Sequence, residues 1–565
     1  MNSRRRYVHF ATAAVLLAGG GAWLISGNTG LTEPSRPLPG VVGTGGAEPR
    51  AGSFKLEASL ARLAAGLRAE DEERARAYGL GRRPDGRGNS VQVVAEAFVE
   101  PGASSAILNA RTSALMAKIA ALGGMVETRW RHLVQHVLPV ESLESLASNP
   151  LVRYVRPPRR PFRQAVMSEG VARTGADIWR NLSPYRADGS TVCVLDLGFA
   201  GYKSLLGNEL PSEVKTRSFR ADGDLEVEEH GTACAEIVRD MAPKAGLLLV
   251  NFDTDVEQHR AVDWISRQDV DAISYSLGWF NAGAGDGTGP ICADVETAAA
   301  ANIVWVSAAG NSAGDHWEGD FVDPDNDGFH NFSGHDEILE FAVPAYMPVG
   351  VFLNWKDFGS WDGYDYGGTD QDFDLYLYFR VGTAWKYIDH SDNRRTGAGA
   401  WPTEEIFGWY ADREAVWGVA IRSILQTKSV RLELFTYNNT SAIEYPVLSR
   451  SISIPADAPG AVAVGATDWT NDALHAYSSR GPTHGGLIKP DFTAPSRVST
   501  ATYGLLNFAG TSASVPHVAG AVALLRGWTP FGPAAVLRIL QQRAVDLGDP
   551  GRDNLYGHGR LNLKK

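Results

Sequence analysis

Cysteine is scarce in this sequence, with three residues in a chain of 565. Three thiols cannot form a disulfide framework, so a packed core must stabilise the fold. The longest apolar run, Ala11 to Ile25, is also short, with about 15 residues where a membrane-spanning helix needs about 20. The net charge of −12 argues against a nucleic-acid-binding protein.

What the sequence does have is globular composition, with 44% hydrophobic and 21% charged residues, which excludes a largely disordered or collagen-like chain. The length favours several domains. Charge is spread unevenly, because residues 1–165 hold 22 basic and 13 acidic side chains while the remainder is strongly acidic. The basic N-terminal part and the acidic body should therefore attract each other, although two unrelated solvated surfaces would give the same counts.

Residues 1–27 have the composition of an export signal or anchor. Three arginines, Arg4 to Arg6, precede the apolar run, and SRRRYV at 3–8 resembles a twin-arginine export signal. We therefore expect export from a bacterial cytoplasm, to give a periplasmic, secreted or membrane-anchored protein. The membrane would be a partner only through this segment, and only if the segment is not cleaved.

Two further regions precede the main body. Residues 28–88 combine a Gly- and Pro-rich linker with a helical pattern over 54–78. Residues 89–165 alternate strand-like and helix-like stretches in the order β-α-β-β-α-β, which predicts a ferredoxin-like α+β domain. The expected strands and helices are, in order, 91–99, 105–122, two strands within 125–140, 141–147 and 151–155.

The main body alternates short apolar runs with helical stretches, which predicts a doubly wound, mostly parallel α/β sheet covered on both faces. Polar side chains follow several of these runs, at the strand ends where such folds place their reactive groups. Asp196 follows the run 191–195, and Asn311 follows the run 303–310. The other expected strands are 246–252, 272–277 and 461–465.

Five short motifs at these ends resemble the subtilase (subtilisin-like) serine peptidase family. They are DLGF at 196, HGT at 230, SLG at 276, AAGN at 308 and GTSASVPHVAG at 510, with SSRGP at 478 and KPDFTAP at 489 before the last. The order Asp, His, Ser is that of subtilisin. The resemblance covers roughly 170–311 and 446–565.

The resemblance implies a serine endopeptidase with Asp196, His230 and Ser512 as its catalytic triad. His230 would act as general base on Ser512, Asp196 would orient the imidazole, and Asn311 would stabilise the oxyanion. This chemistry requires no cofactor. Polypeptides would be the substrates, bound along two backbone segments whose exposed edges pair with an extended peptide: Ser276, Leu277 and Gly278, and Ala308, Ala309 and Gly310.

The sequence departs from the family pattern over 312–445. This stretch holds seven of the 15 tryptophans and 23 acidic against 9 basic residues. Strand-like runs at 351–355 and 374–378 predict an inserted all-β, sandwich-like domain that rims or gates the cleft, or else only adds stability. The catalytic domain would then comprise 166–311 and 446–565.

A candidate calcium site lies in this insert. Asp323, Asp325 and Asp327 have the D-x-D-x-D-G spacing of a calcium loop, but position twelve is Gly334 and not Glu, so the EF-hand match fails. A structural Ca²⁺ ion and an acidic turn without metal are both open.

The basic domain 89–165 resembles the propeptides of subtilases, and would act as an inhibitor and folding partner for its own chain, with a cut somewhere in 156–170. A permanent N-terminal domain is the alternative. Two other functions fit the same residues: a catalytically silent binding protein, or a peptide ligase that resolves the acyl-enzyme with an amine. The three cysteines, Cys193, Cys234 and Cys292, are expected as buried free thiols, and a disulfide between one pair is the alternative.

Overall fold

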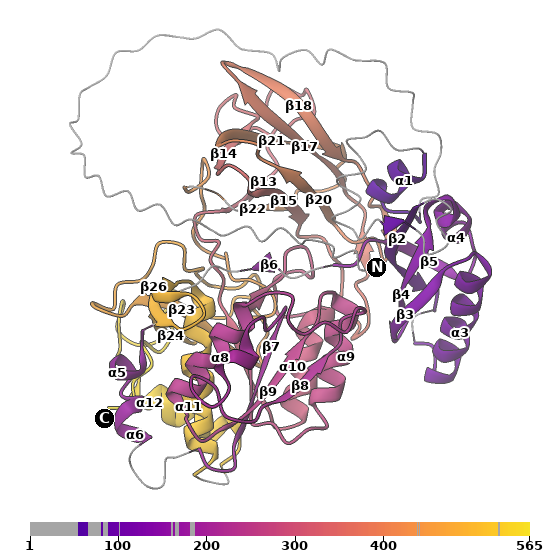
Figure 1. Cartoon of the computed structure of the whole chain (residues 1–565). Coiled ribbons are helices and arrows are strands. Elements are labelled where there is room, and N and C mark those ends of the chain that lie inside the picture. The colour runs from indigo at the N-terminus through magenta and orange to yellow at the C-terminus, as the bar shows by residue number, and fades with distance from the viewer. Residues whose placement is uncertain are drawn as a thin grey trace, which may run out of the picture. The chain divides into compact units, whose positions relative to one another are not determined.

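The computed structural model describes residues 55–65, 81–82, 89–100, 102–159, 162–163, 169–180, 187–437, 439, 441–528 and 531–564 (Figure 1). The predicted export segment and most of the linker lie outside these residues. Within them, no helix combines the length and the apolar character needed to cross a membrane.

The N-terminal α+β domain has the predicted order of elements. Its sheet has the order β1-β2-β4-β3, and β5 also pairs with β2. Every pairing is antiparallel, which is the ferredoxin-like arrangement. Buried Leu115 and Ile119 of α3 pack on Val91 and Val93 of β2 in one core. The elements are α1 (Ala58–Ala65), β1 (Gly81–Arg82), β2 (Asn89–Ala97), α3 (Ser105–Ala121), β3 (Met125–Trp130), β4 (Leu133–Pro139), η1 (Val140–Ser142), α4 (Leu143–Ala147) and β5 (Val152–Arg156).

The central sheet has seven parallel strands in the order β24-β23-β12-β10-β7-β9-β8. Their bounds are β7 (Thr191–Asp196), β8 (Lys215–Ser218), β9 (Gly246–Asn251), β10 (Ala272–Tyr275), β12 (Val304–Ala308), β23 (Ala461–Asp468) and β24 (Phe492–Ser496). Five of these strands were predicted. The sequence analysis missed β8, which is a largely exposed edge strand without an apolar run, and β24, which has Pro495 within it.

Helices cover both faces of this sheet, as the continuous apolar strands predict. Successive residues of β7 point to opposite faces of the sheet. Val192 and Val194 join the core beneath α8 (His230–Met241) and α11 (Thr511–Arg526). Cys193 and Leu195 join the core on the other face, beneath α9 (Asp255–Ile265) and α10 (Pro290–Ala300). The remaining helices are α5 (Val171–Thr174), α6 (Ala176–Trp179), α7 (Tyr202–Leu205) and α12 (Pro533–Arg543).

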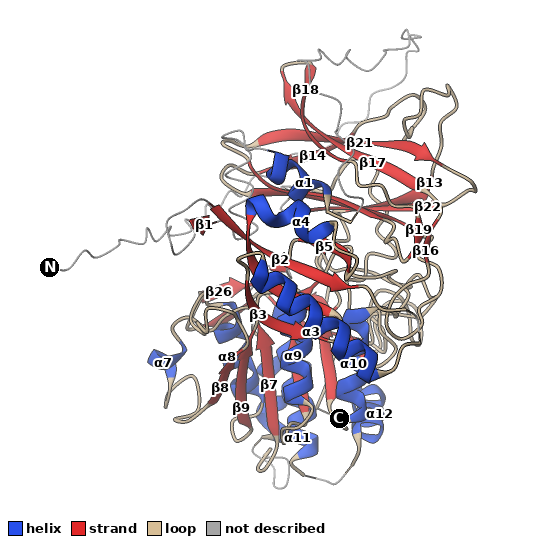
Figure 2. Ribbon diagram, turned by 90° about the vertical axis from the view of Figure 1, so that its right-hand side faces the viewer, coloured by secondary structure: helices blue, strands red, loops and turns tan. Residues whose placement is uncertain are grey.

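The insert forms two four-stranded antiparallel sheets, in the orders β13-β22-β15-β20 and β14-β21-β17-β18. They enclose one hydrophobic core that includes Trp355, Phe373 and Trp417, so the predicted all-β sandwich is confirmed. Figure 2 shows the two sheets as separate layers. The strands are β13 (His316–Asp320), β14 (Leu339–Val343), β15 (Pro348–Trp355), β17 (Asp372–Val381), β18 (Ala384–Ser391), β20 (Thr403–Tyr410), β21 (Ala415–Leu425) and β22 (Arg431–Tyr437).

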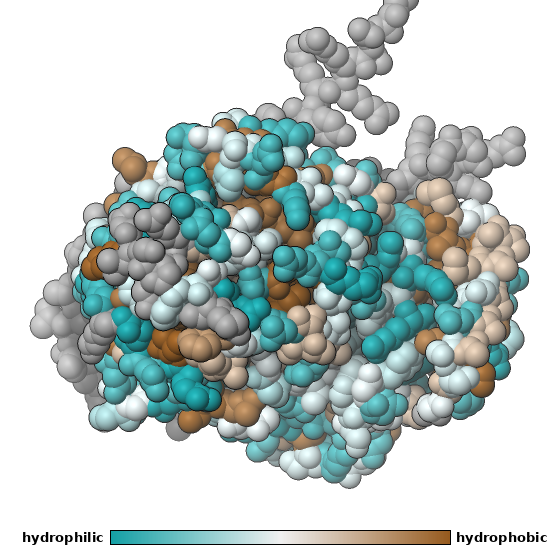
Figure 3. All heavy atoms as spheres, turned by 90° about the horizontal axis from the view of Figure 1, so that it is seen from below, coloured by the Kyte–Doolittle hydropathy of each residue, from teal (hydrophilic) through white to brown (hydrophobic). Residues whose placement is uncertain are grey.

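The other strands are two-residue to five-residue pieces that pair in twos. They are β6 (Phe162–Arg163) with β11 (Leu277–Gly278), β16 (Gly368–Thr369) with β19 (Gly397–Ala398), and β25 (Val498–Thr500) with β26 (Gly504–Phe508). On the face drawn in Figure 3, hydrophobic residues lie in small patches bordered by hydrophilic ones. Cys193, Cys234 and Cys292 are buried and unbridged, as the sequence favoured.

Candidate active site

Asp196 and His230 are in direct contact. Asp196 is the last residue of β7 and His230 the first of α8, and His230 Nδ1 lies 2.8 Å from Asp196 Oδ1 and 2.9 Å from Oδ2. Both side chains are fully buried. A Cβ on Gly231 would lie 2.6 Å from the carbonyl oxygen of Gly198, so only glycine lets α8 begin this close to the end of β7.

Ser512 lies in the first turn of α11, two residues after Gly510, whose φ is +117°. Its Oγ donates to the carbonyl oxygen of Ser276 at 2.9 Å, and Ser276 Oγ donates back to the carbonyl oxygen of Ser512 at 2.9 Å. Cys234, one turn after His230 in α8, has its Sγ 3.8 Å from that same Ser512 oxygen. The start of α11 therefore packs against the first turns of α8.

Asn311 follows β12 and touches the residue that precedes Ser512. Its Oδ1 accepts hydrogen bonds from the backbone N–H of Thr511 at 2.9 Å and from Thr511 Oγ1 at 3.0 Å. Because the amide oxygen accepts these two bonds, the amide nitrogen is the atom through which the Asn311 side chain can donate to another group.

The segment Ser276 to Gly278 borders a bound strand from the same chain. Phe162 and Arg163 of β6 pair antiparallel with Gly278 and Leu277 of β11, as the predicted addition of a peptide to this edge requires. β6 belongs to the connector between the N-terminal domain and the α/β body.

The second predicted edge lies beside Ser453 and Ser479. The carbonyl oxygens of Ala308 and Ala309 accept from Ser453 Oγ at 3.1 and 3.2 Å, and that of Gly310 accepts from the backbone N–H of Ser479 at 2.9 Å. A Cβ on Gly310 would meet Ser479 Oγ at 2.5 Å. In this structure the segment is buried, and its carbonyl oxygens are held by the protein's own hydroxyl and amide groups.

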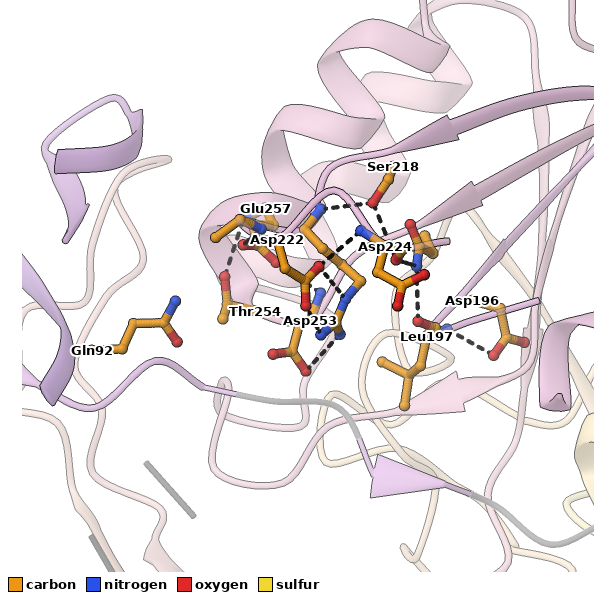
Figure 4. A network of polar contacts seen from close by, with 12 residues as sticks. Gln92, Asp196, Leu197, Ser218, Asp222, Asp224, Asp253, Thr254 and Glu257 are labelled. Carbon is orange, nitrogen blue, oxygen red and sulfur yellow. Dashed lines mark hydrogen bonds and ion pairs between the residues drawn. The ribbon is translucent and has the colours of Figure 1, made fainter. Parts of the chain in front are cut away.

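A network of hydrogen bonds extends from Asp196 toward the N-terminal domain (Figure 4). The backbone N–H of Leu197 donates to Asp196 Oδ1 at 2.8 Å, so the main chain helps to fix this carboxylate. Asn251 Nδ2 links the carbonyl oxygens of Leu197 and Asp224 at 3.2 and 2.8 Å.

At the far side of this network, Glu257 in the first turn of α9 accepts from Gln135 of β4 at 2.9 Å. Beside it, Arg156 of β5 places Nη2 2.6 Å from Asp255 Oδ2, and its Nε lies 2.8 Å from Glu96. Burial lowers the pKa of Arg156, but the two carboxylates outweigh it and hold this pKa above its ordinary value. Asp255 and Glu257 were not predicted as site residues. Their one signal in the sequence is their position in the first turn of a helix, just after the capping residue Thr254.

The predicted acidic loop brings its three carboxylates together. Ligand oxygens of Asp323, Asp325 and Asp327 all lie within 4.8 Å of one another. Burial and these three charges raise the pKa of nearby Glu337 to about 7. Three clustered carboxylates with mutually repelling charges match the preference of Ca²⁺ for oxygen ligands, so the residues present fit the ion.

The C-terminal part of the sequence matches a known family model. Residues 438–559 match the model described as the subtilase family, and this span contains Ser512. Subtilisin BL from Lederbergia lenta is 38% identical over 117 residues, which are 20% of this chain and 40% of that protein. The minor extracellular protease Epr of Bacillus subtilis is 34% identical over 119 residues, which are 20% of this chain and 17% of that protein.

The chain thus spans two fifths or less of the length of these relatives. Among solved structures, the CspB protease of Clostridium perfringens aligns with a TM-score of 0.49 and 16% identity, over 70% of this chain and 97% of that one. The family match carries the Ser512 motif, and the same chain supplies the Asp196–His230 pair in the order typical of subtilisins. The C-terminal part of the chain, which contains Ser512, is therefore similar to the subtilase family.

Proposed function

We propose that this protein is a serine endopeptidase that hydrolyses polypeptides through an acyl-enzyme on Ser512. The observation that carries the proposal is the buried Asp196–His230 pair, at 2.8 Å, beside the helix start that presents Ser512 within the family-matched segment. A hydroxyl, a base and a carboxylate that orients the base are the three parts that acyl transfer from a peptide needs.

In this proposal Ser512 Oγ attacks the scissile carbonyl carbon while its proton passes to His230 Nε2. Asp196 accepts the Nδ1 proton, which fixes the tautomer, and stabilises the imidazolium that forms. His230 then protonates the leaving amine. A water molecule, deprotonated by the same imidazole, attacks the acyl-enzyme and releases the carboxylic acid product.

The tetrahedral intermediate carries a negative oxygen that needs donors. We assign these to the Asn311 side-chain amide and the Ser512 backbone N–H, and the contact between Asn311 Oδ1 and Thr511 supports the first assignment because it turns the amide nitrogen elsewhere. The start of α11, with its unpaired backbone N–H groups, adds favourable potential for the anion.

The substrate would lie along Ser276, Leu277 and Gly278, where β6 lies in this structure. Ala308, Ala309 and Gly310 would line the neighbouring pocket, and their small side chains favour a roomy apolar site. In the antiparallel register of β6, Arg163 pairs with Leu277, the residue after Ser276, whose carbonyl oxygen accepts the Ser512 hydrogen bond. The register therefore favours self-cleavage shortly after Arg163, within the predicted interval 156–170.

The N-terminal domain would accordingly act as a propeptide that blocks the cleft until it is cut off and released. Its buried Arg156–Asp255 contact and the β6 pairing support this role. We further propose that the protein is exported, in keeping with the extracellular relative Epr, and that Ca²⁺ at Asp323, Asp325 and Asp327 stabilises the insert without a part in the chemistry.

Expression of the wild type beside Ser512→Ala tests the proposal. Ser514→Ala is the matched control, since Ser514 also lies in the first turns of α11, and its Oγ donates to the carbonyl oxygen of Ala494. We expect self-cleavage and casein hydrolysis in the wild type and the control, and neither in Ser512→Ala. A Ser512→Ala variant that still cleaves itself and casein would contradict the proposal, and so would a wild type that cleaves neither. Ligated products instead of hydrolysed ones, seen by mass spectrometry, would favour a peptide ligase.

A further inference from the structure

A cavity of about 520 Å³ lies where the N-terminal domain, the connector and the inserted domain meet. Its lining does not include Ser512 or His230. Five arginines line it, Arg153 and Arg156 from β5, Arg159 from the connector, and Arg394 and Arg395 from the insert. Its lining also includes Trp401 and Glu405 of the insert. Carboxylates, arginines and an aromatic ring thus border the same cavity.

Arg159 contacts both the insert and the α/β body. Its guanidinium carbon lies 3.9 Å from the centroid of the Trp401 ring, within the range of a cation–π interaction. Its carbonyl oxygen accepts from the backbone N–H of Asp255, the first residue of α9, at 3.1 Å. Burial and the neighbouring Arg156 lower the pKa of Arg159 to about 10, so it stays charged at neutral pH.

The wall that receives Arg159 is held by residues outside the connector. Trp401 Nε1 donates to Asp365 at 3.0 Å, and its ring meets that of Tyr366 edge-on at 5.3 Å. Tyr366 in turn accepts from the backbone N–H of Ala284, in the α/β body, at 3.0 Å. Because these contacts join the insert to the α/β body directly, the wall remains when the connector departs.

Two carboxylates, Asp255 and Glu405, favour the charged form of Arg159. Glu405 of β20 borders the cavity, and burial raises its pKa above the ordinary value for a carboxyl group. Asp255 faces both Arg156 and Arg159, and these two charges, against its burial, hold its pKa below the ordinary value. An arginine side chain, planar and weakly hydrated, matches an aromatic face flanked by carboxylates better than a lysine does.

The cavity also lies in line with the substrate edge. Arg159 stands three residues before Phe162, which pairs with Gly278 of β11. A polypeptide bound on β11 in the same register therefore places its own residue at the position of Arg159.

We propose that Trp401, Glu405 and the N-terminus of α9 form a binding site for an arginine of the polypeptide substrate, three residues before the residue that pairs with Gly278. In this structure Arg159 of the same chain occupies the position that the substrate arginine would take. The inference rests on the proposed peptidase function and adds a preferred class of substrate, chains with arginine well upstream of the cut. It also gives the inserted domain a part in substrate selection.

Quenched fluorescent peptides of residues 156–170 test the site on the self-processed wild-type enzyme. One peptide has the natural sequence, a second has Arg159→Ala, and a third has Pro158 and Arg159 exchanged, which keeps the net charge. We expect the natural peptide to have about tenfold higher kcat/KM than the other two. Trp401→Ala should remove this advantage and Trp401→Phe should reduce it, while Trp385→Ala, in a tryptophan that lies beside Arg380, should keep it.

Equal kcat/KM for the three peptides on an active wild type would overturn the arginine site and leave the peptidase function standing. An advantage that persists in folded Trp401→Ala and Trp401→Phe would overturn it too. Cleavage of none of the peptides and of no casein by the wild type would instead contradict the peptidase function. The comparison of peptides on the wild type needs no variant, so it holds even if a Trp401 variant does not fold.

Discussion

Nδ1 of His230 lies 2.8 Å from Oδ1 and 2.9 Å from Oδ2 of Asp196, with both side chains buried between the end of β7 and the start of α8. The carboxylate fixes the orientation of the imidazole through Nδ1. A second buried pair, His259 and Asp294 at 2.9 Å, joins α9 to α10 away from that point. The two pairs allow a catalytic role to be separated from a structural one.

Asp196→Asn should lower kcat by about ten-thousandfold, because the amide favours the wrong imidazole tautomer. Steady-state hydrolysis of a short peptide measures the change. Asp294→Asn is the control, and should lower the melting temperature while kcat stays within about threefold of the wild type. Equal losses of kcat in the two variants would contradict the assigned role of Asp196.

Asn311→Asp should lower kcat by about one hundredfold to one thousandfold, with little change in KM. The substitution keeps the oxygen that accepts from Thr511 but removes the amide donor and adds a negative charge beside the oxyanion. Circular dichroism should show an unchanged fold. A variant of full activity would exclude Asn311 from the oxyanion site.

Arg156→Ala should speed release of the N-terminal domain. Removal of this guanidinium leaves Asp255 and Glu96 buried without their partner, which typically costs about 3–5 kcal/mol. The lag before peptidase activity appears should shorten, and the cleaved domain should elute separately in size-exclusion chromatography. Arg129→Ala, an exposed residue of the same domain 3.4 Å from Asn109, should leave the lag unchanged. An equal or longer lag in Arg156→Ala would contradict the inhibitory docking.

Chelator should lower the melting temperature of the wild type, and the effect should grow as pH rises through about 7. The pKa of Glu337 is raised to about 7 in the folded protein, so without metal the carboxyl cluster is most stable at low pH, and repulsion grows as Glu337 ionises. Ca²⁺ would offset this repulsion and compete with the proton. Asp323→Asn together with Asp327→Asn should abolish the chelator effect. No effect of chelator at pH 8 would exclude a stabilising metal.

The sequence predicted most of the fold because its signals are local. Apolar runs at 191–195 and 303–308 indicated buried parallel strands, and the order of elements in 89–165 indicated the ferredoxin-like domain. Asp196 and His230 were found because each stands where an element ends or begins. The all-β insert was recognised from its strand-like runs, such as 351–355.

The parts that could not be predicted depend on contacts between distant residues. Nothing near Ser453 or Ser479 signals that they bind the carbonyl oxygens of Ala308 to Gly310. Arg159 and Trp401 lie far apart in the sequence, so their contact follows from how the insert packs beside the connector. Docking of Arg156 on Asp255 matches the charge asymmetry that the sequence showed, but the partners themselves needed the structure.

Labelling with a fluorophosphonate, followed by mass spectrometry of the modified peptide, tests the central claim most directly. A hydroxyl activated by an imidazole reacts covalently with this reagent. We predict a single adduct on Ser512 in the self-processed wild type, with none in His230→Ala and an unchanged adduct in Ser514→Ala. An unlabelled Ser512 in folded, processed protein, or equal labelling in His230→Ala, would contradict the account.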